Sequence, residues 1–354
     1  MGLTGSRTRP ITAPINEDAE VGTRVVLITG CSTGIGLSTA VILAEDVKRF
    51  KVYATMRNLE KKSELENAVG KHLGESLIIK ALDVRNEEEV NRLVKEIEME
   101  EGRIDVLVNN AGQGLVSVFE CIPIETAQHV FDTNYFGVMR MLKAVLPGMK
   151  ARRKGHIINI SSVIGVNGTP FSEVYSASKF ALEGLTESLA PTLRKFDIRC
   201  SLIEPGPVTT SFTQNAKFLR EGIDISSADE KTQQLLKAAL KEMYSNVQTQ
   251  SQTPEEVASI IKSVILSANP HLRYQTNSKY GPGEIQAKLS DLTGDKAIQL
   301  MERRFFPDCL LDAIVHSSNI SCNGSSLDAL AELRPVLASA APGSLLHGPC
   351  SWRP

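Results

Sequence analysis

The sequence lacks several features that would point to a membrane-spanning, nucleic-acid-binding or metal-binding protein. No run of about 18 apolar residues occurs, so no ordinary membrane-spanning helix is expected. Neither charge sign dominates, because 39 basic residues stand against 41 acidic ones, and no basic patch marks a nucleic-acid partner. The six cysteines show no metal-ligand spacing, so no metal site is expected. A globular protein remains, with 42% hydrophobic residues available for its core.

Both ends of the sequence lack apolar periodicity. Residues 1–22 are polar and interrupted by Pro, Gly and Thr, and residues 306–354 are rich in Ser, Ala, Gly and Pro. Disorder is therefore predicted for both segments, with one folded domain over residues 23–305. No export signal is recognisable, which leads us to expect a reducing, cytoplasmic setting.

Between these ends, short apolar runs alternate with segments long enough for helices. Their continuous apolarity is typical of strands that are buried on both faces of a sheet. The alternation predicts an α/β fold with a parallel, doubly wound sheet, in which "HLRYQTN" near position 271 adds a seventh strand. Apolar residues at helical spacing over 209–250 form either a lid or a face that packs on the core. The expected strands are "RVVLI", "KVYATM", "LIIKALDV", "IDVLVNN", "HIINIS" and "IRCSLIEPG".

A glycine-rich turn joins the first predicted strand to the first predicted helix. In "VVLITGCSTGIGL", the residues Gly30, Gly34 and Gly36 allow backbone N–H groups to approach a pyrophosphate, which the positive end of the helix stabilises. A glycine trio alone is often only a tight turn. Its place between a strand and a helix favours dinucleotide binding.

The end of the second strand indicates which dinucleotide is bound. NAD enzymes place a carboxylate there for the adenine ribose, but "ATMRN" offers Arg57, which can pair with a 2′-phosphate. NADP(H) is therefore the expected cofactor, with Ser32 and Thr33 as further donors to that phosphate. The alternative is that Arg57 is an ordinary surface charge. Asp83 is placed to accept from the adenine amino group and Val84 to pack on its ring, although Asp also ends strands as a turn residue.

A phenol and an ammonium group stand one helical turn apart in "EVYSASKFALEG". At this spacing Tyr175 and Lys179 share one helix face, and the ammonium is expected to lower the pKa of the phenol. Ser162, thirteen residues before Tyr175, ends a strand where doubly wound folds bind their ligands, and can hydrogen-bond a substrate carbonyl. Each residue alone is commonly a surface, core-edge or turn residue. Their joint spacing favours a catalytic group.

These motifs together resemble the short-chain dehydrogenase/reductase family. "TGCSTGIG", "NNAG", "FDTNYFG", Ser162, "YSASK" and "PGPV" occur in the family's order over residues 24–300. The resemblance implies a single Rossmann-type domain with about seven strands and helices on both faces. It also implies that Tyr175 is the general acid or base, that Lys179 holds the nicotinamide ribose, and that Ser162 polarises the substrate carbonyl. Asn134 would support a proton-relaying water. The cofactor would contact Gly30, Ser32, Thr33, Gly34, Ile35, Gly36, Asn110, Gly112, Tyr175, Lys179, Val208 and Thr210.

The resemblance also narrows the substrate and partners. Runs such as "NNAGQGLV" and "IEPGPV" are similar to the branch that acts on retinol, and a related branch acts on 17β-hydroxysteroids. A lipophilic alcohol or carbonyl is therefore expected, retinoid first and steroid second, with peripheral membrane contact and a homodimer packed through the helices of Asn134 and Tyr175. The non-enzyme alternative is a nucleotide-sensing scaffold.

Overall fold

The computed structural model describes residues 22–212 and 222–307. All but the last of these lie in one compact unit, Met1–Phe306. The segments predicted to be disordered lie almost wholly outside the described residues, and the predicted domain boundaries therefore stay predictions.

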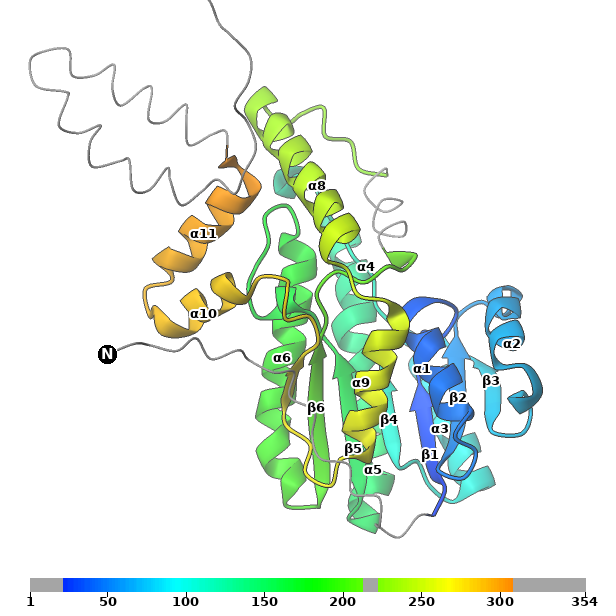
Figure 1. Ribbon diagram of the computed structural model, residues 1–354. Coiled ribbons are helices and arrows are strands. Elements are labelled where there is room, and N and C mark those ends of the chain that lie inside the picture. Colours follow the sequence, from blue (N-terminus) through cyan, green and yellow to red (C-terminus); the bar gives the residue numbers. More distant parts are fainter. Residues whose placement is uncertain (1–21, 213–221, 308–354) are drawn as a thin grey trace, which may run out of the picture. The chain divides into compact units, whose positions relative to one another are not determined.

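A seven-stranded parallel sheet forms the centre of the molecule (Figure 1). The strand order is β3-β2-β1-β4-β5-β6-β7, so the chain runs outward from β1 to one edge and then from β4 to the other. This confirms the predicted doubly wound sheet, including the seventh strand. The strands are β1 (Arg24–Ile28), β2 (Phe50–Met56), β3 (Leu77–Ala81), β4 (Val106–Asn109), β5 (Gly155–Ile160), β6 (Ile198–Glu204) and β7 (Arg273–Gln275).

Helices cover both faces of the sheet. One face carries α1 (Gly34–Ala44), α2 (Ser63–Val69) and α9 (Pro254–Leu266), and the other carries α3 (Glu87–Glu101), α5 (Gly137–Arg152) and α6 (Glu173–Arg194).

Successive strand residues point to opposite faces. In β1, Val26 and Ile28 join the core under α1 and α9, whereas Val25 and Leu27 join the core under α3 and α5. The unbroken apolar runs of the sequence are thus explained by a sheet that is buried on both sides.

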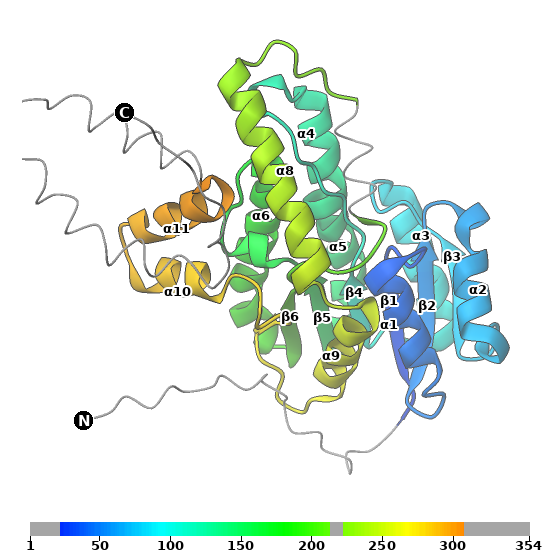
Figure 2. The same ribbon diagram turned by 45° about the horizontal axis from the view of Figure 1, so that its top comes forward.

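Further helices lie over the carboxyl ends of the strands. Both views place α8 (Glu230–Gln250) there, and α4 (Ile124–Phe131) lies near it (Figure 2). Leu236 and Ala239 of α8 are buried against small apolar clusters, so this part of the 209–250 stripe packs on the molecule. Phe218 and Leu219 of the same stripe lie outside the described residues. The chain continues through α10 (Pro282–Ser290) and α11 (Asp295–Phe305).

Within residues 22–212 and 222–307, no helix combines the length and apolarity needed to cross a membrane.

Candidate active site

The predicted site residues gather at the carboxyl edge of the sheet. The glycine turn follows β1, Asn110 and Gly112 follow β4, and Ser162 follows β5. The loop after β6 carries Val208 and Thr210. Parallel strands end at a common edge, so motifs that lie far apart in the sequence meet there.

The glycine turn requires glycine for two physical reasons. Gly30 and Gly34 have φ angles of 73° and 62°, in the left-handed region that side chains disfavour. A Cβ atom on Gly36 would lie 2.4 Å from the Asn110 Nδ2 atom and 2.4 Å from the Gly30 carbonyl oxygen. Asn110 fixes the turn, because its amide donates 2.9 Å hydrogen bonds to the carbonyls of Thr29 and Gly30.

Thr29 was given no role from the sequence. Its buried hydroxyl accepts hydrogen bonds of 3.0 Å from the backbone N–H groups of Asn110 and Ala111. The turn after β1 and the turn after β4 are thereby joined into one unit.

The start of α1 fits a phosphate group. The first turn of α1 holds no acidic residue, so its free N–H groups and positive end meet no carboxylate from their own helix. Ser32 and Thr33 directly precede α1, Ile35 lies in its first turn, and all three are half-buried. The Ser211 hydroxyl donates a 2.8 Å hydrogen bond to Thr33 Oγ1. Methyl Cγ2 of Thr210 would lie 2.9 Å from a Cβ on Gly34, which places the β6 loop directly over the turn.

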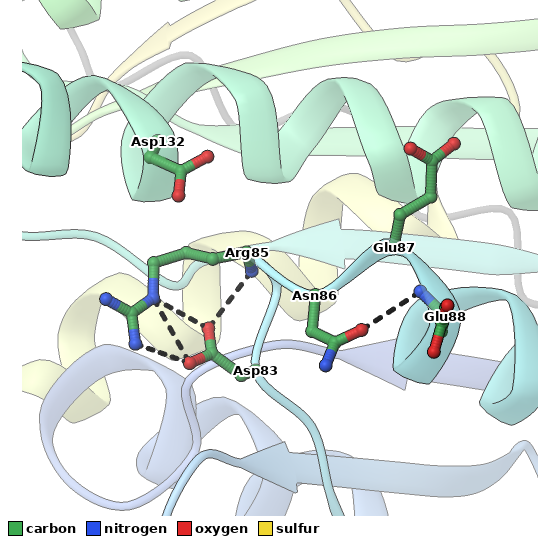
Figure 3. Close-up of a pocket in the computed structure, with 6 residues that line it drawn as sticks. All are labelled: Asp83, Arg85, Asn86, Glu87, Glu88 and Asp132. Atoms are coloured by element: carbon green, nitrogen blue, oxygen red, sulfur yellow. Dashed lines mark hydrogen bonds and ion pairs between the residues drawn. The ribbon is translucent and has the colours of Figure 1, made fainter.

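Arg57 and Asp83 lie near each other at the ends of β2 and β3. Arg57 is exposed. The pKa of Asp83 is lowered mainly by hydrogen bonds from Arg85, and the Arg57 charge adds a smaller effect. The Arg85 guanidinium donates to both carboxylate oxygens, with 2.6 Å between Nη2 and Oδ2 (Figure 3). The Asp83 carboxylate therefore already has a partner, which the sequence did not reveal, and its expected contact with adenine stays a prediction.

Val84 is buried beside the π-helical turn that precedes α5. Its Cγ2 would lie 2.7 Å from a Cβ on Gly137, so the side chain packs against this helix. Val208 is half-buried and pairs with Gln252 in an isolated parallel bridge. The predicted contacts of both residues with a cofactor stay predictions.

Tyr175 and Lys179 lie on one face of α6, as predicted, and both are buried. Lys179 is 5% exposed, its ammonium donates a 2.8 Å hydrogen bond to the Ile160 carbonyl, and Nζ lies 5.8 Å from the centre of the Tyr175 ring. A Cβ on Gly112 would lie 3.7 Å from the same Nζ atom, so the loop after β4 borders the ammonium.

The expected effect of the ammonium on the phenol was wrong for this structure. Burial raises the pKa of Tyr175 to about 12, and the Ser162 hydroxyl only partly opposes this. Burial also lowers the pKa of the Lys179 ammonium, to about 8. Desolvation therefore sets the direction of the pKa shift for both groups.

Ser162 begins the short 3-10 turn Val163–Gly165 after β5. Its Oγ atom accepts a 3.2 Å hydrogen bond from Ile164 N–H and donates a 3.3 Å bond to the Pro205 carbonyl. These bonds fix the hydroxyl at the end of β5, facing Tyr175. The Phe212 ring lies 5.6 Å from the Tyr175 ring, centre to centre, and adds an apolar wall.

Asn134 lies in a π-helical turn, Asp132–Phe136, between α4 and α5. Its side chain exchanges two 2.8 Å hydrogen bonds with the Gln113 backbone and donates to Ser178 Oγ, which donates to the Tyr175 carbonyl. Such single π turns occur frequently at functional sites. A Cβ on Gly112 would lie 3.4 Å from Asn134 Oδ1, so the amide and the Lys179 ammonium border the same glycine.

A series of side-chain contacts runs from Arg85 through His129 to Gln113, whose backbone is hydrogen-bonded to Asn134. Arg85 Nη1 lies 3.2 Å from His129 Nδ1, and His129 Nε2 lies 3.2 Å from the Gln113 side-chain amide. A guanidinium and an amide nitrogen can only donate, and a neutral imidazole has one acceptor nitrogen, so His129 accepts from only one of these two groups at a time. No sequence pattern indicates this series of contacts, because its members come from three separate segments.

Fold and site together define a dinucleotide-dependent oxidoreductase. The short chain dehydrogenase family model matches residues 24–221, and the chain belongs to this family. It is 48% identical over 276 residues to retinol dehydrogenase 8 of Bos taurus, covering 77% of this chain and 86% of that protein. It is 41% identical over 292 residues to 17-beta-hydroxysteroid dehydrogenase type 1 of Homo sapiens, covering 80% and 86%.

A solved short chain dehydrogenase/reductase from Burkholderia phymatum, in complex with NAD, shares the fold. Its TM-score is 0.66 at 24% identity, covering 77% of this chain and 95% of that one.

Proposed function

We propose that this protein is an NADP(H)-dependent oxidoreductase that interconverts a lipophilic alcohol and its carbonyl. The observation that carries the proposal is the meeting of Ser162, Tyr175 and Lys179, all buried, at the sheet edge that also holds the glycine turn. The bound nicotinamide would supply or accept the hydride, and the chain must then move the matching proton at the substrate oxygen.

Tyr175 is the proton carrier in this proposal, and Ser162 orients the substrate oxygen. With a pKa of about 12 the phenol is neutral at pH 7, which is the state that a proton donor needs. Lys179, with a pKa of about 8, is an ammonium at the same pH and stabilises charge that develops on the phenol oxygen. Both states favour carbonyl reduction near neutrality.

Arg57 supports NADP(H) over NAD(H). It is exposed at the end of β2, where a carboxylate would hold the ribose of NAD, and a guanidinium can pair bidentately with a 2′-phosphate. The glycine turn, the start of α1, Asn110 and Thr210 would hold the rest of the cofactor.

A retinoid is the substrate that we favour, with a 17β-hydroxysteroid as the second candidate. The higher identity to retinol dehydrogenase 8 supports this order. Phe212 provides an apolar surface beside the Tyr175 phenol, as a lipophilic substrate requires. Such substrates partition into bilayers, so peripheral membrane contact is part of the proposal.

The test is NADPH oxidation by the purified full-length chain, with all-trans-retinal and estrone in parallel assays and NADH as the cofactor control. We expect turnover with NADPH and a higher kcat/KM for all-trans-retinal. A clear preference for estrone would replace the retinoid proposal by the steroid one. Binding of NADPH without turnover of any lipophilic carbonyl would favour a nucleotide-sensing scaffold.

A further inference from the structure

Four ionisable side chains follow one another along a single face of α6. Tyr175, Lys179, Glu183 and Glu187 are spaced by four residues, so each lies about one turn from the next. Lys179 and Glu183 are each only 5% exposed, whereas the Glu187 side chain is 52% exposed. The row therefore places a buried carboxylate directly after the buried ammonium of the candidate site.

Arg273 of β7 joins this row from the neighbouring strand. Its guanidinium pairs with Glu183, with Glu187 at 2.6 Å, and with the fully buried Glu204 of β6 at 2.6 Å. Counted with Lys179, two cations face three carboxylates. When all three carboxylates are ionised, at pH values above the pKa of Glu183, the cluster carries one more negative than positive charge.

Glu183 and Lys179 also pack against one common element, the 3-10 turn that follows Ser162. A Cβ on Gly165 would lie 3.1 Å from Lys179 Cβ and 3.2 Å from Glu183 Cγ. Among the described residues, the buried Oε1 atom of Glu183 has no partner at hydrogen-bond geometry, and the Ser161 hydroxyl is the neutral polar group that acts on this carboxylate. The negative charge of the Glu183 carboxylate is therefore only partly compensated. This carboxylate is buried and lies one helical turn from the Lys179 ammonium.

The charge states of the pair depend on each other. Burial lowers the pKa of Lys179 to about 8, and Glu183 is the group that opposes this fall. Burial, with a smaller part from the Glu204 charge, raises the pKa of Glu183 to about 7, against the Ser161 hydroxyl and Arg273. A further charged group, Lys288 of α10, lies near the 3-10 turn after Ser162: its ammonium donates a 2.5 Å hydrogen bond to the Val166 carbonyl and lies 4.1 Å from the centre of the Phe180 ring of α6. The elements around Lys179 contribute the Tyr175 phenol, the Ile160 carbonyl and the Asn134 amide.

We propose that Glu183 is a positioning residue for the reaction: its carboxylate keeps Lys179 in the ammonium form, and so keeps a positive charge beside the Tyr175 phenol. The inference rests on the proposed function. It goes further by assigning a role to a residue whose described contacts are with Arg273 of β7 and the turn after Ser162.

The test is the pH profile of kcat/KM for NADPH-dependent carbonyl reduction, with unfolding temperature and NADPH affinity measured beside it. In Glu183→Gln we expect the alkaline limb, where Lys179 loses its proton, to move about one unit toward lower pH. Glu183→Asp keeps the charge and should restore the wild-type limb. Glu187→Gln removes the exposed carboxylate of the same row and is the matched control, expected to leave the limb in place.

A second neutral variant guards against a folding defect in the first. Glu183→Met fills a similar volume without a polar group to satisfy, and the same shift is expected from it. An unshifted limb in a folded neutral variant, or an equal shift in Glu187→Gln, would overturn the inference. Absence of turnover in the wild-type chain would instead overturn the proposed function, so the two failures are distinguishable.

Discussion

At the residue scale, the chemistry of the candidate site is governed by desolvation. Tyr175 and Lys179 each have the pKa that burial imposes, above 10 for the phenol and below 10.5 for the ammonium. The spacing of the two residues could be derived from the sequence, because it depends only on helix geometry. The direction of the phenol's pKa shift could not, because burial is a property of the folded chain.

Replacing Tyr175 by Phe removes the proposed proton carrier while keeping the ring that contacts Phe212. We expect kcat to fall by about 10²–10⁴-fold, the usual contribution of a positioned acid or base. NADPH affinity, measured by fluorescence titration, should change little. A variant that retains wild-type turnover would exclude Tyr175 as the proton donor.

Replacing Arg57 by Ala tests the cofactor preference. A lost hydrogen bond to a charged group costs about 1.5–3 kcal/mol, so the KM for NADPH should rise by about 10- to 100-fold. The KM for NADH serves as the control and should stay nearly constant, because NADH has no 2′-phosphate. An equal loss with both cofactors would assign Arg57 a structural role.

The low pKa of Lys179 predicts a pH-dependent stability. The folded value of about 8 lies below the ordinary 10.5, so the unfolded chain binds more protons between these values. The contribution of Lys179 to the free energy of unfolding therefore rises with pH over this window, by at most about 1.4 kcal/mol per pH unit. The free energy of unfolding, measured by urea titration at several pH values from 7.5 to 9.5, should rise more steeply with pH in the wild type than in Lys179→Met. Equal slopes would contradict the lowered pKa.

At the scale of elements, the glycine turn and α1 show how far a motif can be interpreted. The sequence predicts Gly30, Gly34 and Gly36 at the turn between a strand and a helix. The structure places Gly30 in that turn and Gly34 and Gly36 in the first turn of α1. The sequence did not predict that Asn110 would brace the turn, nor that Asp132–Phe136 would form a π turn. The first depends on two strands meeting across the sheet, and the second interrupts a segment that otherwise has ordinary helical periodicity.

A pair of glycine substitutions tests the bracing. In Gly36→Ala the new methyl group would overlap the Asn110 amide and the Gly30 carbonyl, and we expect a loss of about 1–3 kcal/mol in unfolding free energy together with weaker NADPH binding.

Gly184→Ala is the control, because this exposed position inside α6 has open space around its Cβ. It should stabilise the protein by about 0.5–1 kcal/mol. Thermal unfolding and NADPH titration of both variants provide the measurements. Equal behaviour of the two variants would contradict a close-packed turn.

At the scale of the whole molecule, the sheet was the most predictable part. Each expected strand is present, because a strand that is buried on both faces needs an unbroken apolar run, and such runs are visible in a sequence. The packing of α8 could not be decided in advance. Its apolar stripe is the same whether it forms a lid or covers the molecule.

Exposed apolar side chains on α4, the π turn and α6 support the proposed homodimer. Ile124 is 68% exposed, Phe136 45% and Phe180 38%, all on or beside the helices that carry Asn134 and Tyr175. Light scattering after size exclusion should give twice the chain mass for wild type. The Ile124→Asp/Phe136→Glu double variant should move toward the monomer mass.

Leu292→Glu is the matched control for the double variant. Leu292 is fully exposed in the connection between α10 and α11, and its substitution should leave the mass unchanged. Monomeric wild-type protein would exclude the dimer.

The two outer strands of the sheet restrict how copies of this molecule can associate. β7 is only three residues long, and its Arg273 is engaged by carboxylates of α6 and β6. β3 carries Lys80, which pairs with Glu96 and Glu100 of α3. A very short edge strand and an edge strand with charged side chains both oppose pairing with a strand from another chain. Self-assembly through continued β-pairing is therefore disfavoured, which leaves helical surfaces as the route by which two chains can meet.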